Sequence, residues 1–498
     1  MHFTVDTTAE RHPISPYVYG MNQMDFGGRH RSLRLGRLGG NRWTAYNWET
    51  NASNAGADYR HQNDGYLGGG DTPGEAVRPW VEEAHAQGAS MIVTVPLAGY
   101  VAADKNGDGD VNQTPDYLNV RFEPTGIKGG RFAYPPDTGD GVVYLDEFVA
   151  WLEGTFPNAR NDPSRTIFYS LDNEPDLWSN THPRIRPTGS VTYAELVERT
   201  TAAAAAIKRV APRALVFGPV SYGWNGYVNL QDAPDNGGRD FLDFYLEQVR
   251  AAGQGQRLVD VLDLHWYSEA KAGGTSILSQ STTPEIAAAR VQAPRSLWDP
   301  GYVETSWISQ DAGVGAIRLI PRLREKIAAH YPGTRLAFTE WFYGGGDHVS
   351  GAIAHADVLG IFGREDVFAA TLWNIYEDQT RYLDAAFLAY CDFDGQGSRF
   401  GDTSVGASTS DHVLTSLYAS VDGGRDDRVV LVFLNKSTGR VTGEVTVTHD
   451  VGLARGRTFL VTSSSATLTG GPELRPQARN VFPVDLPASS LTVVELTP

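Results

Sequence analysis

Two glutamates stand at the ends of apolar segments that lie far apart in the chain. Glu174 follows the run 166–173 (TIFYSLDN) and precedes Pro175, and Glu340 closes the run 335–340 (RLAFTE). A single glutamate after a strand is usually a loop carboxylate in a salt bridge or at a helix cap. Two carboxyl groups facing each other across a cleft are what glycoside cleavage requires, because one donates a proton to the leaving oxygen while the other attacks the anomeric carbon or activates water. The pair therefore predicts a glycosidase site.

The residue types around the two glutamates fit the same chemistry. Asn173 can donate a hydrogen bond to a sugar hydroxyl, or serve as a turn residue. Arg42 is a charge neighbour for Glu340 or a partner in a structural ion pair. His265 and Tyr267 orient Glu340 or contact sugar, and a hydrogen-bonded core histidine is the alternative. Aromatic planes stack on the apolar face of a pyranose, and the candidates for stacking are Trp48, Trp178, Trp266 and Trp373.

Eight short apolar runs supply the strands that must position these side chains. They occupy residues 17–23, 35–42, 90–98, 166–173, 215–221, 259–267, 335–341 and 368–375. Amphipathic helical patterns lie between most of them, at 73–87, 144–154, 192–210, 241–252, 313–330 and 352–362. Near-continuous apolar strands that alternate with helices indicate a parallel sheet, and eight such units predict an α/β fold of the (β/α)₈ or TIM-barrel type. Reactive groups in such a barrel lie at the carboxyl ends of the strands, where both glutamates fall.

The pattern changes after about residue 395. Short strands with turn signals between them follow, at 429–435, 443–449, 458–463, 480–486 and 491–497. This spacing predicts a small antiparallel β-sandwich. Residues 3–7 (FTVDT) alternate like a strand, and we expect them to pair into that sandwich. The predicted domains are therefore a catalytic barrel over 14–394 and a β-sandwich formed by 1–13 together with 395–498.

Composition narrows the possible partners. The 498 residues include 42 Lys and Arg against 59 Asp and Glu, a net charge of −17. Such a chain should be repelled by nucleic acid and by anionic membranes, whereas a neutral polymer is not repelled. The single cysteine excludes an intramolecular disulfide and a cysteine metal cluster. No apolar run approaches the ~20 residues that span a bilayer, and the start, MHFTVDTTAE, lacks the basic and apolar regions of a secretory signal.

Longer motifs carry a resemblance to a known family. They are GGNRWTAYNWETNASNAGADY (39–59), AGYVAADKNGDG (98–109), PDTGDGVVYLDEFV (136–149), SLDNEPDLW (170–178), DLHWYSEA (263–270), TEWFYGGGDH (339–348) and TLWNIYED (371–378). Together they resemble glycoside hydrolase family 44, within the clan A of retaining barrel glycosidases. The resemblance implies an endo-acting β-1,4-glucanase with Glu174 as general acid/base and Glu340 as nucleophile. It also implies a carboxyl separation of about 5 to 5.5 Å, against about 6.5 to 9.5 Å for an inverting enzyme.

The resemblance further implies structural calcium, and two sites offer oxygen ligands. The run 104–112 (DKNGDGDVN) matches the first half of an EF-hand loop, but position twelve is Pro115 and the carboxylate of Asp116 comes one place later. A solvated acidic turn is the alternative. The candidate ligands there are Asp104, Asn106, Asp108 and Asp110, and the second set is Glu49, Asp137 and Asp140. Catalysis itself should need no cofactor.

We expect a monomeric enzyme that acts on xyloglucan, carboxymethylcellulose or mixed-linkage glucan. We expect it to be extracellular although this chain carries no secretory signal, because such a signal is removed from a mature secreted protein. The enzymatic alternatives are a xylanase, a mannanase or an arabinofuranosidase of the same clan. A non-catalytic glycan-binding protein on a barrel scaffold is the alternative outside enzymes. The presence of both Glu174 and Glu340 argues against it, because binding needs aromatic residues but no acid and nucleophile pair.

Overall fold

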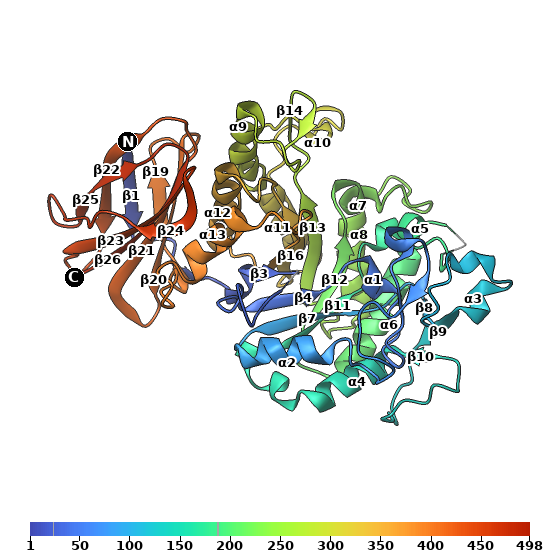
Figure 1. The fold of residues 1–498 in the computed structure, drawn as a ribbon. Helices are drawn as coiled ribbons and strands as arrows, with labels where there is room; N and C mark the ends of the chain where they lie inside the picture. The colour runs from blue at the N-terminus through green and yellow to red at the C-terminus, as the bar shows by residue number, and fades with distance from the viewer. Residues whose placement is uncertain (23, 187–188) are drawn as a thin grey trace.

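The computed structural model describes residues 1–22, 24–186 and 189–498 (Figure 1). Eight parallel strands close into a barrel in the order β11-β12-β13-β16-β17-β3-β4-β7. Their bounds are β3 Gly20–Met21, β4 Leu35–Leu38, β7 Ser90–Val95, β11 Ile167–Leu171, β12 Val216–Ser221, β13 Val261–Tyr267, β16 Arg335–Phe342 and β17 Ala369–Leu372. Each predicted apolar run coincides with one of these strands, although β16 extends one residue beyond its run, so the (β/α)₈ prediction is confirmed. Residue 23, at the end of the first predicted run, lies outside the described residues.

Helices cover the outside of the barrel. Those that follow its strands are α2 (Arg78–Ala86), α4 (Leu145–Thr155), α6 (Tyr193–Val210), α8 (Phe241–Ala252), α11 (Leu319–His330), α12 (Val349–Arg364) and α13 (Arg381–Cys391). Local chemistry fixes their starts: the Thr192 hydroxyl accepts from Glu195 N at 3.0 Å ahead of α6, and the Asp240 carboxylate caps α8 in the same way. Helix α13 was not predicted. The described residues between β3 and β4 form no helix.

The second domain is a β-sandwich. One sheet has the order β19-β1-β22-β25 and the other β2-β18-β20-β21-β26-β23-β24, in which β2 is His12–Pro13. The predicted strands appear as β21 (Arg425–Asn435), β22 (Val441–Thr448), β23 (Arg455–Thr462), β25 (Val481–Leu486) and β26 (Ser490–Thr497), whereas β18 (Thr403–Ser404), β19 (Gly406–Thr409), β20 (Thr415–Asp422) and β24 (Ser465–Gly470) were not predicted. Strand β1 (His2–Asp6) pairs in parallel with β22, which confirms that the N-terminal segment joins this domain.

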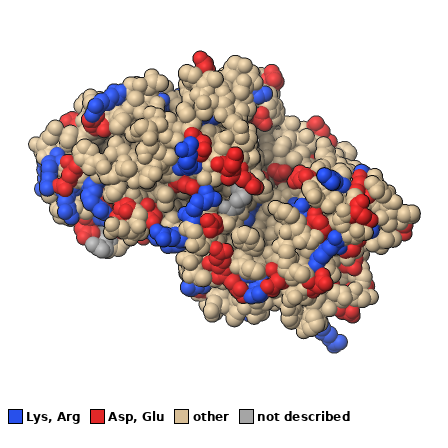
Figure 2. All heavy atoms as spheres, viewed as in Figure 1, with Lys and Arg blue, Asp and Glu red and all other residues tan. Residues whose placement is uncertain are grey.

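The two ends of the barrel differ in chemistry. A layer of apolar side chains fills the end at which the strands begin; it consists of Leu35, Ile92, Phe168, Phe217, Val261, Ala337 and Ala369. His265 and Glu340 lie in the second halves of their strands β13 and β16, away from this apolar layer. Figure 2 shows acidic and basic side chains interspersed over the visible face rather than separated into a basic patch. Among the described residues no helix is both long and apolar enough to cross a membrane.

Candidate active site

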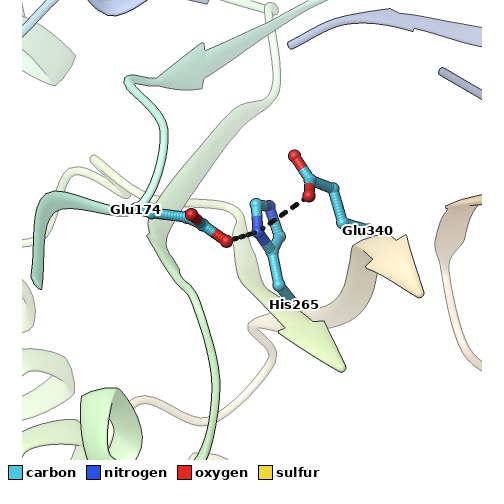
Figure 3. A group of neighbouring side chains, drawn as sticks. All are labelled: Glu174, His265 and Glu340. Atoms are coloured by element: carbon cyan, nitrogen blue, oxygen red, sulfur yellow. Dashed lines mark hydrogen bonds and ion pairs between the residues drawn. The ribbon is translucent and has the colours of Figure 1, made fainter. Parts of the chain in front are cut away.

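Three barrel strands bring the two glutamates and one histidine together. Glu174 comes three residues after the end of β11, His265 lies on β13, and Glu340 lies on β16 (Figure 3). One ligand atom of each side chain lies within 4.8 Å of the others, and no other group of three His, Cys, Asp or Glu residues does so in the described part of the chain. The oxygens of the two glutamates are thus closer than the roughly 6.5 Å minimum of inverting enzymes. The separation fits a retaining pair.

The surroundings of Glu174 raise the pKa of its carboxyl group. Burial raises the pKa of Glu174 to about 7, while Arg37 opposes this shift and the carboxylate of Asp58 adds to it. Its Oε1 lies 2.8 Å from Nδ1 of His265. Burial also lowers the pKa of His265 to about 3, so the imidazole is neutral at ordinary pH. Glu174 can therefore hold a proton near neutrality, as a general acid must.

Glu340 has hydrogen-bond donors on both of its oxygens. Arg37 donates from Nη1 to Oε1 at 2.8 Å, and the Tyr267 hydroxyl donates to Oε2 at 2.7 Å. Arg37 also donates to Oδ1 of Asn22 at 3.0 Å and to Oδ1 of Asn173 at 2.8 Å. The carboxylate is buried and held in one orientation. This geometry suits a nucleophile aimed at a fixed point.

The predicted charge partner of Glu340 was wrong. Arg37 takes that place, whereas Arg42 lies on α1 (Asn41–Thr44) and pairs with Asp64 at 2.5 Å. The cause is the strand boundary: β4 ends at Leu38, and Gly40 then turns the chain with φ of 90°. Only glycine adopts this region without cost. The GlyGly pair in LGRLGGNR is the signal that could have ended the predicted strand earlier and pointed to Arg37.

A strained turn presents Glu174. Asp172 and Glu174 both have positive φ, 66° and 43°, a conformation that non-glycine residues adopt only when the surroundings enforce it. The enforcing group is the buried carboxylate of Asp172, which accepts hydrogen bonds from the Thr44 hydroxyl at 2.7 Å, Trp178 Nε1 at 3.3 Å, Ala98 N at 3.1 Å, Asn173 N at 2.7 Å and also Leu97 N. Burial raises the pKa of Asp172 to about 6. Sequence reasoning did not identify this positioning role.

The predicted stacking residues divide into core and cleft. Trp48, Trp178 and Trp266 are fully buried, so the prediction that they stack on sugar was wrong. Trp48 packs on Phe148 with ring centroids 5.7 Å apart, Trp178 donates to Asp172, and Trp266 donates to Tyr343 at 3.0 Å. Trp373 does line the cleft. A tryptophan beside polar residues in the sequence does not show which face of the backbone it occupies.

The cleft has a volume of about 950 Å³ and is open to solvent above the glutamates. Asn173, Glu174, Tyr267 and Glu340 all line it. Arg42 also lines it, with its guanidinium 4.4 Å from the ring centroid of Tyr66. The further aromatic lining consists of Trp43, Tyr59, Tyr66 and Trp373, of which Tyr66 is 79% exposed. An open cleft with aromatic walls admits the middle of a polymer rather than only its end.

The loop predicted to bind calcium at 104–110 is already neutralised. Arg121 donates to both oxygens of Asp104, at 2.7 and 3.1 Å, and to Asp108 at 3.2 Å. Arg184 pairs with Asp110 at 2.6 Å, and the Asn106 amide donates to Asp108 at 2.8 Å. A guanidinium therefore occupies the place where a cation would lie. We therefore do not place the proposed calcium at these four residues.

The second predicted set has an excess of negative charge. Burial, followed by the carboxylates of Glu123, Glu147 and Asp140, raises the pKa of Glu49 to about 8, and Lys128 opposes this only in part. Burial and Asp140 also raise the pKa of Glu123, although a hydrogen bond from Asn47 lowers it. Asp137 is exposed, and its Oδ1 accepts a hydrogen bond from Gly139 N at 3.0 Å. Glu49, Glu123 and Asp140 thus carry a surplus of negative charge of the kind that a hard cation offsets, although their oxygens do not form a group within 4.8 Å of one another in this structure; Glu123 was not among the predicted residues.

Comparison with known proteins gives consistent matches. Residues 52–270 match the model of glycoside hydrolase family 44. The chain is 42% identical to "Endoglucanase A" of Paenibacillus lautus, over 98% of this chain and 71% of that protein. A xyloglucanase of Paenibacillus polymyxa, solved with xyloglucan, has a TM-score of 0.94 at 39% identity and covers 100% of this chain and 99% of its own. An endoglucanase of Clostridium thermocellum gives 0.93 at 40% identity, with 99% of each chain covered.

Proposed function

The chain belongs to glycoside hydrolase family 44, and from this premise we propose that it cleaves β-1,4-glucan chains internally with retention of anomeric configuration. The observation that carries the proposal is the pair Glu174 and Glu340, whose oxygens lie within 4.8 Å across an open, aromatic cleft. Its substrates are xyloglucan, carboxymethylcellulose and mixed-linkage glucan. Such polymers are too large to enter a cell, so we propose that the enzyme acts outside it.

The first chemical step forms a glycosyl-enzyme. A carboxylate oxygen of Glu340 attacks the anomeric carbon, while Glu174 gives its proton to the glycosidic oxygen. The bond between that carbon and oxygen breaks, the new chain end leaves as an alcohol, and an ester joins the sugar to Glu340. Arg37 and Tyr267 hold the attacking carboxylate, since each donates to one of its oxygens. Asn173, fixed by Arg37, donates to a hydroxyl of the sugar beside the bond.

The second step releases the sugar. Glu174, now ionised, takes a proton from a water molecule that attacks the same carbon, and the ester to Glu340 breaks. Two inversions restore the original configuration. The pKa of about 7 lets Glu174 serve as acid and then as base at the same pH. His265 lies 2.8 Å from Glu174 and keeps its carboxyl group in reach of both positions.

We also propose a structural cation beside the catalytic barrel. Glu49, Glu123 and Asp140 would hold calcium, which would supply positive charge to a surplus of carboxylates and take no part in the chemistry. Removal of calcium should therefore lower stability before it lowers activity. This ligand set replaces the arginine-neutralised loop at 104–110.

The test of the proposed function is azide rescue. Wild type, Glu174→Gln and Glu340→Gln are assayed on xyloglucan and on an aryl cello-oligosaccharide with an activated leaving group. Both variants should lose polymer hydrolysis, and azide should restore turnover of the aryl substrate by Glu174→Gln with a β-azide product, because azide attacks the glycosyl-enzyme without a base. Xylan and mannan serve as comparison polymers. Wild-type rates in both variants would refute the assignment.

A further inference from the structure

An aromatic hollow lies on the outer side of the barrel, apart from the catalytic cleft. It opens between α2 and α4 and has a volume of about 490 Å³. The loop before α4 contributes Phe132 and Tyr134, and α4 contributes Trp151. None of the residues that line this aromatic hollow also lines the cleft with Glu174 and Glu340. The proposed function leaves it without a role.

Two large aromatic side chains in the aromatic hollow are unusually exposed to solvent. Phe132 is 38% exposed and Tyr134 is 60% exposed, although both are flat aromatic groups that normally pack inside. The wall behind them is rigid: Trp151 lies parallel to Phe148, with ring centroids 6.1 Å apart, and the backbone at Gly74 lies directly against its ring. The hollow therefore offers two exposed rings in front of a fixed one.

The loop that carries the exposed rings is anchored to the start of α4. The Asp146 carboxylate accepts from Lys128 N at 2.9 Å and from Gly129 N at 2.8 Å. The Glu147 carboxylate accepts from Ala133 N, between the two rings, at 2.7 Å and pairs with the Lys128 ammonium at 2.7 Å. Both carboxylates are buried. Rings held in this way lose little freedom when a ligand stacks on them.

The polar groups of the hollow favour a neutral ligand. Glu75 and Arg78 form a two-pronged ion pair on its rim, through Nε and Nη2 of the arginine, at 2.7 and 2.5 Å. Their charges cancel locally, while the chain as a whole carries −17, which disfavours a polyanion. The volume lies within the ~300–1,000 Å³ of small-ligand sites. A protein partner would instead need about 800 Å² of surface on each side.

We propose that the aromatic hollow is a second glycan-binding site, which holds an uncleaved stretch of neutral β-glucan by stacking pyranose rings on Phe132, Tyr134 and Trp151. The choice of β-glucan rests on the proposed function. Glu75, Arg78 and the hydroxyls of the lining threonines Thr72 and Thr155 bind the sugar hydroxyls. A polymer held at two places on one molecule dissociates more slowly than one held only in the cleft, since rebinding is intramolecular.

Electrophoresis in native gels that contain xyloglucan tests this site without any need for cleavage. The background is Glu340→Gln, so that the polymer in the gel stays intact. The double change Phe132→Ala with Tyr134→Ala should weaken the apparent affinity for xyloglucan about tenfold, as loss of central aromatic contacts does. The double change Phe132→Tyr with Tyr134→Phe keeps both aromatic rings, so xyloglucan in the gel should retard this variant as strongly as the Glu340→Gln parent. Val303→Ala, which trims an exposed apolar residue elsewhere, is the matched control.

A second measurement separates the hollow from the cleft. With Glu340 intact, the double alanine variant should hydrolyse a short aryl cello-oligosaccharide at the wild-type rate. Unchanged retention of the double alanine variant in the gel would overturn the proposal. An equal loss of turnover of the aryl substrate would also overturn it. So would the finding that the alanine changes dissociate a dimer of the protein while its retention by xyloglucan stays the same. If wild type cleaves no β-glucan, the proposed function fails. Ring-dependent retention would still support the second site in that case.

Discussion

The perturbed acidity of Glu174 makes a prediction about rate that can be worked from the structure. With a pKa of about 7, Glu174 is about nine-tenths protonated at pH 6 and about one-tenth protonated at pH 8. The value of kcat/KM on xyloglucan should therefore fall tenfold for each pH unit above about 7. At pH 9 it should be near 1% of its maximum. The assay is release of reducing ends between pH 5 and 9, after a check that the enzyme survives each pH.

A change of leaving group isolates the proton donor. The dinitrophenolate of a dinitrophenyl cello-oligosaccharide leaves without protonation. The alkaline decline in kcat/KM should therefore disappear with this substrate, because kcat/KM reports the step that forms the glycosyl-enzyme. Glu174→Gln should turn over the same substrate with no alkaline decline. An equal decline with both substrates, or a midpoint below about pH 5.5, would refute Glu174 as the general acid.

The same pKa makes a prediction about stability. The folded state raises the pKa of Glu174 from its ordinary value of 4.5 to about 7, so the folded protein binds a proton in this window that the unfolded chain does not. Stability should fall as the pH rises from about 4.5 to 7, by about 3 kcal/mol in total at ~1.4 kcal/mol for each pH unit. The unfolding midpoint of Glu174→Gln should equal that of wild type near pH 4.5 and should be higher than that of wild type at pH 8. Equal unfolding midpoints at pH 8 would contradict a buried charge.

Three further predictions concern the surroundings of the site. Arg37→Lys should lower kcat/KM about a hundredfold, because one ammonium group cannot donate to Glu340 and Asn173 together, whereas Arg42→Lys should change KM alone. Steady-state kinetics on xyloglucan measure both variants. Equal effects of the two substitutions would contradict the separate roles of the two arginines. Trp373→Ala should raise KM about tenfold without a change in the unfolding midpoint, whereas Trp178→Ala should destabilise the fold by about 3 to 5 kcal/mol. Calcium should raise the unfolding temperature of wild type but not of Glu49→Gln, and a rise in both would exclude this ligand set.

The barrel could be predicted because its strands are buried on both faces. Such strands appear as continuous apolar runs, and runs 90–98 and 335–341 coincide with β7 and β16 to within a few residues. Both glutamates follow from the same rule, since the carboxyl end of a strand is visible once the strand is known. Helix α13 was not predicted because its apolar stretch runs directly into a region of turns, and its last residue is the single cysteine, Cys391.

The surroundings of the glutamates depend on the exact residue at which each strand ends and on the direction in which each side chain points. A pattern of residue types does not contain this information. A strand boundary misplaced by four residues exchanged Arg42 for Arg37. Trp48 and Trp178 have neighbours typical of a sugar cleft, yet both point into the core. The role of Asp172 leaves no signal in the local sequence, because it depends on donors from Thr44, Leu97 and Ala98, more than 70 positions away.

The place of strand β1 has a consequence for how the protein is made. Residues His2–Asp6 are synthesised before the barrel, yet they pair with β22, and the Thr7 hydroxyl donates to the carbonyl oxygen of Thr448, which lies 441 positions later. Strand β1, with the apolar side chains of Phe3 and Val5, therefore has no β22 to pair with while the whole barrel is synthesised. A chain truncated after the barrel would lack the partner strand of β1 and would leave β1 exposed to solvent, and exposed apolar strands aggregate. The sandwich thus closes last, and expression of the barrel alone should require removal of the first strand as well.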